Sequence, residues 1–207
     1  WRWNTTQPFT TWVTEFNMIE QKPYTINNSW AHGLLVSSQI DQLLSKTNAE
    51  MFHFHSIGAE SFPVFSALQL MTKDSTYLQP TTSGIVTAVW NKLTQNAEQL
   101  YQINVETKRW NLNYKAKSKE NPNNLREEKN INFTPIHAYI SYEKGKAKLL
   151  IVNLSEERIS TDLSSIIGHC EMTQYYGKPS NKIVKVNKQN LKGIVELEPY
   201  SISLLEE

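Results

Sequence analysis

The chain has 207 residues, and 39% of them are hydrophobic, which is enough to bury a sizeable core in one or two domains. Lys and Arg number 21 against 20 for Asp and Glu, and the resulting net charge of +1 favours neither nucleic acid nor an anionic membrane, so we expect neither as a partner. Cys170 is the one cysteine, which excludes an internal disulfide, and no apolar run is long enough to span a bilayer.

The sequence begins at Trp1 without an initiator Met, almost directly on a predicted strand. This start suggests a cleavage product that lacks upstream sequence, and a secretion signal could have been lost with it. The compartment therefore stays open, with a secreted or periplasmic location as one option.

The first half of the sequence predicts alternating strands and helices. Residues 9–16 are rich in Thr, Val and aromatic side chains, which is typical of a strand, and Ser29 is a suitable N-cap for an amphipathic helix over 30–46. Residues 49–55 predict a second strand, and Ser83-Gly84 opens a second helix that we expect to reach about Gln102. Two successive strand-to-helix units imply parallel strands covered by helices, as in α/β folds.

The second half of the sequence has a different pattern. Lys115 to Asn132 is dominated by Lys, Glu and Asn, which predicts an exposed loop or linker. From Pro135 onward, short alternating segments separated by glycines predict an antiparallel β-sandwich. Its expected inward-facing residues include Tyr139, Leu149, Ile151 and Val184.

Glu15 is the first catalytic candidate. The run Trp-Val-Thr-Glu-Phe-Asn at 12–17 places this carboxylate at the end of the first strand. Catalytic groups of β/α barrels lie at the C-terminal ends of their strands, although a Glu at a strand end is often a solvated loop residue.

Four segments together resemble a known enzyme family. The chain resembles the C-terminal part of retaining glycoside hydrolases of the α-L-arabinofuranosidase type in the segments Thr14-Glu15-Phe16-Asn17, Ser29-Trp30-Ala31-His32-Gly33-Leu34, the strand with His53 and His55, and Pro80-Thr81-Thr82-Ser83-Gly84. The resemblance implies an α/β plus all-β fold: the last two β/α units of a (β/α)8 barrel over 1–110, a polar linker or loop over 111–134, and an antiparallel β-sandwich over 135–207.

The same resemblance implies hydrolysis of O-glycosidic bonds in polysaccharide, with Glu15 as the nucleophile. Retaining hydrolysis needs a second carboxyl group as acid/base. In the family this is a Glu on the fourth barrel strand, which by this alignment lies upstream of Trp1. The chain would then carry half of a catalytic pair, and an upstream barrel segment or another chain would complete the barrel.

Further polar residues are candidates for binding the sugar. We expect Asn17, His53 or His55 to hold sugar hydroxyls, because His53 and His55 alternate with phenylalanines and so share one strand face. Glu60 could orient His55 or a hydroxyl, or lie on a loop surface. A His-x-His pair can also bind zinc, but no third ligand stands at convincing spacing, so we expect no metal and no cofactor.

Trp30 and His32, two further candidates for binding the substrate, lie in the first turn of the helix that follows the Glu15 strand. The indole of Trp30 could form a stacking wall for a sugar ring, or it could anchor the helix to a sheet. Three functions remain open: a glycoside hydrolase or its C-terminal fragment, a non-catalytic carbohydrate-binding module, and an assembly module that another chain completes.

Overall fold

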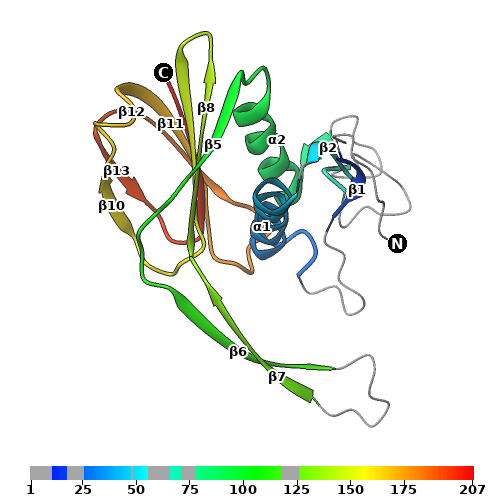
Figure 1. The fold of residues 1–207 in the computed structure, drawn as a ribbon. Helices are drawn as coiled ribbons and strands as arrows, with labels where there is room; N and C mark the ends of the chain where they lie inside the picture. The colour runs from blue at the N-terminus through cyan, green and yellow to red at the C-terminus, as the bar shows by residue number, and fades with distance from the viewer. Residues whose placement is uncertain (1–10, 18–25, 48, 56–65, 71–77, 118–125) are drawn as a thin grey trace, which may run out of the picture.

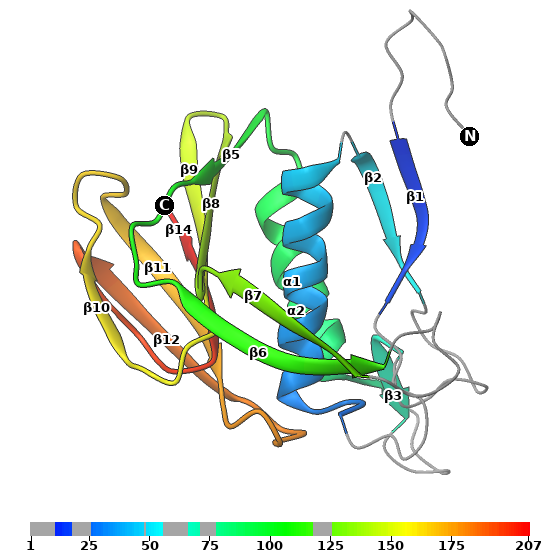
Figure 2. The same cartoon turned by 60° about the horizontal axis from the view of Figure 1, so that its bottom comes forward.

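The computed structural model describes residues 11–17, 26–47, 49–55, 66–70, 78–117 and 126–207. These segments form four layers (Figures 1 and 2): a parallel strand pair, two helices, a six-stranded antiparallel sheet, and a two-stranded antiparallel pair beyond it. Within these segments no helix is both long and apolar enough to cross a membrane.

The first layer and the first helix agree with the sequence prediction. Strands β1 (Thr11–Phe16) and β2 (Ala49–Phe54) pair in parallel, and helix α1 (Trp30–Lys46) connects them. The helix begins where a cap residue permits it, because the side chain of Ser29 accepts a hydrogen bond from the backbone N–H of His32 at 3.4 Å.

The second helix is shorter than the sequence predicts. Helix α2 (Thr82–Thr94) follows the β3–β4 hairpin (Leu68–Leu70 and Leu78–Pro80), which the sequence pattern did not reveal. The prediction that this helix reaches Gln102 is wrong. Asn96 adopts a φ of 58°, a left-handed conformation that Asn tolerates, and this residue turns the chain out of the helix.

The residues just after this turn join the large sheet. Strand β5 (Gln99–Ile103) pairs with β8, and the sheet order is β12-β11-β14-β9-β8-β5. The other strands of this sheet are β8 (Ile136–Glu143), β9 (Lys146–Asn153), β11 (His169–Tyr176), β12 (Lys185–Lys192) and β14 (Ser201–Glu206). The outer pair is β10 (Ile159–Asp162) with β13 (Ile194–Leu197).

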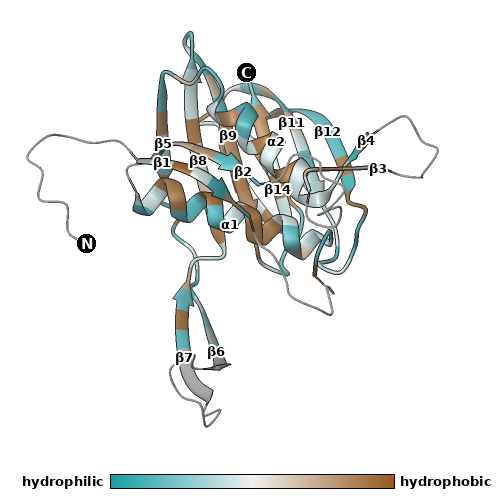
Figure 3. Cartoon of the chain, turned by 90° about the vertical axis from the view of Figure 1, so that its right-hand side faces the viewer, coloured by the Kyte–Doolittle hydropathy of each residue, from teal (hydrophilic) through white to brown (hydrophobic). Residues whose placement is uncertain are grey.

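Two hydrophobic cores lie on the two faces of the six-stranded sheet. The first joins helix residues such as Ile40 and Trp90 to Tyr139 and Leu204 of the sheet, and Figure 3 shows hydrophobic residues where helices and sheet meet. The second joins the opposite face to β10, β13 and the loop after β10. Of the residues expected to face inward, Tyr139, Leu149 and Ile151 are buried, and Val184 is partly buried against the first core.

The helices and the sheet therefore share one core. Two amides at the start of α1 also donate to carbonyls of the β11–β12 loop, from Trp30 to Asn181 at 2.6 Å and from Ala31 to Pro179 at 2.8 Å. The parts predicted as separate units over 1–110 and 135–207 are thus docked closely, and β5 from the first part belongs to the sheet of the second.

The polar stretch predicted as a loop or linker is a β-hairpin. Strands β6 (Trp110–Lys117) and β7 (Arg126–Phe133) pair in register, and the hairpin extends away from the four layers (Figure 1). Lys, Glu and Asn have low strand propensity, so composition favoured a loop. The continuous antiparallel pairing of the two strands outweighs that preference, and the Trp110–Phe133 pair at its base, with ring centroids 6.2 Å apart, adds an aromatic contact.

Candidate functional site

The C-terminal ends of β1 and β2 form the candidate site. The backbone N–H of His55 donates to the carbonyl of Phe16 at 2.9 Å, which continues the parallel pairing to the end of both strands. The rings of Phe52 and Phe54 pack edge-to-face on Phe16, each with centroids 5.6 Å apart, on the side that faces the helices. This apolar packing directs the polar residues of the strand ends to the opposite side.

Glu15 and His55 converge at this edge. Nδ1 of His55 lies 3.8 Å from Oε1 of Glu15. The His55 side chain is 38% exposed and the Glu15 side chain is 72% exposed. A carboxylate that is open to solvent can approach a substrate carbon, and an imidazole at this distance can orient the carboxylate after a small rotation. The pair thus supplies one nucleophile candidate and one neighbouring hydrogen-bonding group.

Asn17 has a positioning contact in this structure. Its side-chain amide donates to the backbone carbonyl of His55, so it links the end of β1 to the end of β2. We expect this bond to hold Glu15 and His55 next to each other. The prediction that Asn17 binds a sugar hydroxyl stays a prediction.

The remaining predicted site residues lie in different surroundings. His53 is exposed on β2, whereas its neighbours Phe52 and Phe54 are half-buried, so the alternation expected for this strand is present. Glu60 lies outside the described residues. Among the residues that are described, no three His, Cys, Asp or Glu side chains are grouped closely enough to hold a metal ion.

Trp30 and His32 are buried, which corrects their prediction as sugar-binding residues. Trp30 has no exposed surface, and its indole N–H donates to the carbonyl of Tyr200 at the start of β14. His32 is 1% exposed, and its Nδ1 accepts from the backbone N–H of Asn28 at 3.2 Å. A sugar ring cannot reach either side chain, and the packing alternative for Trp30 agrees with the structure.

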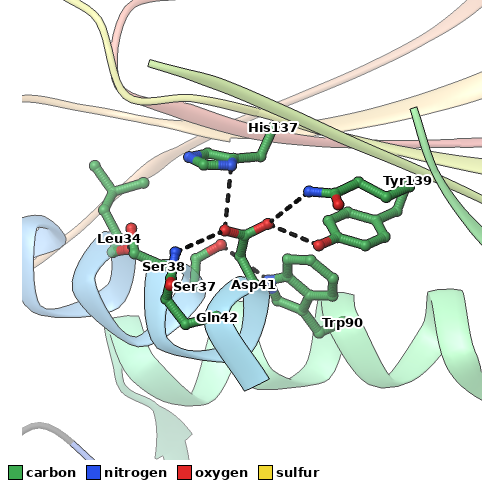
Figure 4. Close-up of polar contacts among 9 residues, drawn as sticks. Leu34, Ser37, Ser38, Asp41, Gln42, Trp90, His137 and Tyr139 are labelled. Atoms are coloured by element: carbon green, nitrogen blue, oxygen red, sulfur yellow. Dashed lines mark hydrogen bonds and ion pairs between the residues drawn. The ribbon is translucent and has the colours of Figure 1, made fainter. Parts of the chain in front are cut away.

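A buried polar cluster on α1 escaped the sequence reasoning. The carboxylate of Asp41 accepts hydrogen bonds from the hydroxyl of Tyr139 at 2.7 Å and from the amide of Gln102 at 3.4 Å, and Nδ1 of His137 lies 3.3 Å away (Figure 4). Asp41 stands seven residues after Leu34, on the apolar face of the helix. A charged residue at such a position signals a buried partner, because an unpaired charge would be costly there.

The environment of Asp41 sets its titration. Burial works to raise the pKa of its carboxyl, but hydrogen bonds from His137 and Tyr139 outweigh burial and hold the pKa below the ordinary value of 3.8. Burial and the bond to Asp41 raise the pKa of the Tyr139 hydroxyl far above its usual range, so this hydroxyl remains a donor.

We expect Asp41→Asn to lower the free energy of unfolding at neutral pH by about 1.5 to 3 kcal/mol, because charge-assisted bonds across the helix–sheet contact are lost. A carboxyl whose pKa is lower in the folded than in the unfolded protein stabilises the fold at pH values above the unfolded pKa. This stabilisation is lost as the pH falls through the lower pKa of the folded state. The gap between wild type and variant should therefore be constant near neutral pH and shrink below about pH 4, as measured by urea unfolding. Glu171→Gln, at an exposed carboxylate, is the control, and parallel pH profiles for Asp41→Asn and wild type would contradict the assignment.

No protein-family model matches the sequence, and no curated protein sequence matches it. Solved structures do match the fold. A GH51 α-L-arabinofuranosidase from Thermotoga petrophila superposes with a TM-score of 0.67 at 13% identity, over 95% of this chain and 42% of the other. The α-L-arabinofuranosidase from Thermotoga maritima superposes with a TM-score of 0.65 at 13% identity, over 94% of this chain and 42% of the other.

A third similar structure belongs to another family. A glycoside hydrolase family 30 xylanase from Clostridium acetobutylicum has a TM-score of 0.56 at 9% identity, over 94% of this chain and 41% of the other. At these identities the likeness is one of fold, and that fold is like a glycosidase's. The chain spans about two-fifths of the length of the solved structures that it matches.

Proposed function

We propose that this chain is the C-terminal segment of a retaining glycoside hydrolase and that Glu15 is its nucleophile. The observation that carries the proposal is the meeting of Glu15 with His55 at the C-terminal ends of two parallel strands, where β/α barrels hold their catalytic groups. The fold likeness to arabinofuranosidases and a xylanase supports a carbohydrate substrate. This chain matches only about two-fifths of each of those structures, which supports its being part of a longer enzyme.

The proposed reaction has two displacements. An oxygen of Glu15 attacks the anomeric carbon while the glycosidic bond breaks, and an acid/base carboxyl from the upstream segment gives its proton to the leaving oxygen. The same upstream residue then takes a proton from water, which attacks the anomeric carbon and releases Glu15. His55 orients the Glu15 carboxylate, and Asn17 keeps the two strand ends in place.

A covalent intermediate on Glu15 is the direct test. The longer polypeptide that contains the upstream barrel segment would be treated with activated 2-deoxy-2-fluoro glycosides of arabinofuranose and of xylose, and its peptides analysed by mass spectrometry. We expect one added sugar mass on the peptide that contains Glu15, and the same result with Glu50→Gln, which changes an exposed carboxylate on β2. Labelling of a different carboxylate would refute the assignment.

A non-catalytic assembly or carbohydrate-binding module remains the alternative, and one observation favours assembly. Parallel strands normally have both faces covered, yet Trp12 and Met51 of the β1–β2 pair are 63% and 43% exposed. Met51 also borders an apolar pocket of about 350 Å³ between β2 and the helices, which another segment could fill. Light scattering on the chain discriminates, because a stable 23.9 kDa monomer would count against assembly with copies of itself.

A further inference from the structure

A pocket of about 490 Å³ lies at the base of the β6–β7 hairpin. One wall is the segment that enters β6, from Thr107 to Asn111, and the other is the turn between β9 and β10, from Ser155 to Ile159. Its size falls within the range of small-molecule sites. It lies in the sheet layers and includes no residue of the Glu15 site.

An aromatic ring is fixed in the wall of this pocket. Trp110 is partly exposed, and its ring lies edge-to-face against Phe133, its direct cross-strand partner, with centroids 6.2 Å apart and planes at 62°. An indole held in this way offers a flat apolar face with an N–H at its edge and loses little conformational entropy when it binds. Such a surface suits the C–H face of a sugar ring.

The polar residues of the pocket carry both signs of charge. Lys108 and Arg109 stand on one wall and Glu156 and Glu157 on the other, all four exposed, and none of them forms an ion pair among the described residues. Two cations and two carboxylates give the pocket no net charge. The donors and acceptors fit a neutral ligand with many hydroxyls, whereas an anion would meet the carboxylates and a cation would meet Lys108 and Arg109.

The turn that carries the carboxylates is ordered by its own hydrogen bonds. The side-chain oxygen of Asn153 accepts from the backbone N–H of Ser155 at 2.9 Å and from its hydroxyl at 2.6 Å, and the amide of Asn153 donates to the carbonyl of Glu157 at 2.9 Å. The wall opposite Trp110 is therefore formed before any ligand binds. Preformed walls lower the entropic cost of binding.

We propose that this pocket binds a neutral oligosaccharide segment, with Trp110 as the stacking surface and Arg109 and Glu157 as hydroxyl partners. The site is separate from Glu15 and does not depend on the proposed catalytic function. In a polysaccharide-degrading enzyme it would hold a second stretch of the same polymer.

Affinity electrophoresis in gels that contain soluble arabinan, arabinoxylan or polygalacturonate tests the proposal on the chain as it stands. We expect arabinan or arabinoxylan to retard the wild type. We expect Trp110→Ala to raise the dissociation constant by about tenfold or more. Tyr101→Ala is the matched control, because Tyr101 is 52% exposed and also forms an edge-to-face aromatic pair, with Tyr142. The pocket shares no residue with the Glu15 site, so loss of the catalytic proposal would leave this one intact.

The double change Arg109→Ala with Glu157→Ala keeps the net charge and leaves Trp110 in place. It therefore tests binding at the pocket even if Trp110→Ala disturbs the hairpin. We expect the double change to weaken retardation as well. The proposal is overturned if neither neutral polymer retards the wild type, if retardation occurs with polygalacturonate alone, or if either Trp110→Ala or the double change binds as the wild type does.

Discussion

Replacing Glu15 with Gln in the longer polypeptide should lower kcat on aryl glycosides by on the order of 10⁴ to 10⁶, the range seen when a member of a catalytic unit is removed. Gln keeps the size and hydrogen-bonding capacity of the side chain but cannot form the glycosyl ester. His55 lies beside Glu15, and its proposed role is to orient the Glu15 carboxylate, so we expect His55→Gln to lower kcat by a smaller factor, on the order of 10 to 10². The measurement is steady-state release of nitrophenol from aryl arabinofuranosides and xylosides.

A matched change separates this loss from a general loss of carboxylates. Glu50→Gln alters an exposed carboxylate of the adjacent strand and should leave kcat within about twofold, since surface substitutions away from special features have small effects. If Glu15→Gln retains the activity of the longer polypeptide, Glu15 is not the nucleophile, and assembly becomes the better account of the strand pair.

Trp30→Ala should be the most destabilising single substitution among the residues discussed. The side chain is fully buried in the first core and its indole N–H bonds the Tyr200 carbonyl, so the change leaves both a cavity and an unpaired carbonyl. We expect a loss of about 3 to 5 kcal/mol in the free energy of unfolding. That is a large share of the roughly 5 to 15 kcal/mol that holds a domain folded.

Two further variants divide this effect into its parts. Trp30→Phe keeps most of the packing and loses the hydrogen bond, for an expected cost of about 1 to 3 kcal/mol, and Trp12→Ala, at a 63% exposed indole, should stay within about 0.5 kcal/mol. Urea unfolding followed by circular dichroism measures all three. Equal losses for Trp30→Ala and Trp12→Ala would show that helix α1 does not depend on its contact with the sheet.

Local signals made the first part of the fold predictable. Ser29 marks the start of α1, the periodic leucines that follow mark its length, and β-prone residues surround Glu15 and His55. Parallel pairing followed from the order of these elements, and it brings Glu15 and His55 to the same edge. The sequence predicted both residues of this pair, although it did not reveal that Asn17 holds the strand ends together.

Long-range contacts explain what the sequence did not reveal. Strand β5 holds Leu100, Tyr101 and Ile103, which suit a strand as well as the end of a helix, and its pairing with β8, more than thirty residues later, makes it a strand. The sequence left open whether Trp30 stacks on a sugar or packs in a core; in the structure it is buried in the first core, and its indole N–H bonds to the carbonyl of Tyr200, 170 residues later. Asp41 was passed over because its partners His137, Tyr139 and Gln102 are distant in sequence.

The position of β14 has a consequence for biosynthesis. This strand, Ser201–Glu206, lies inside the six-stranded sheet between β11 and β9, and its Ile202 and Leu204 complete the core over both helices. A ribosome delivers it after every other strand of that sheet. The helices therefore leave the exit tunnel with their apolar faces uncovered. A nascent chain in which β14 has not yet left the ribosome should be a target for chaperones.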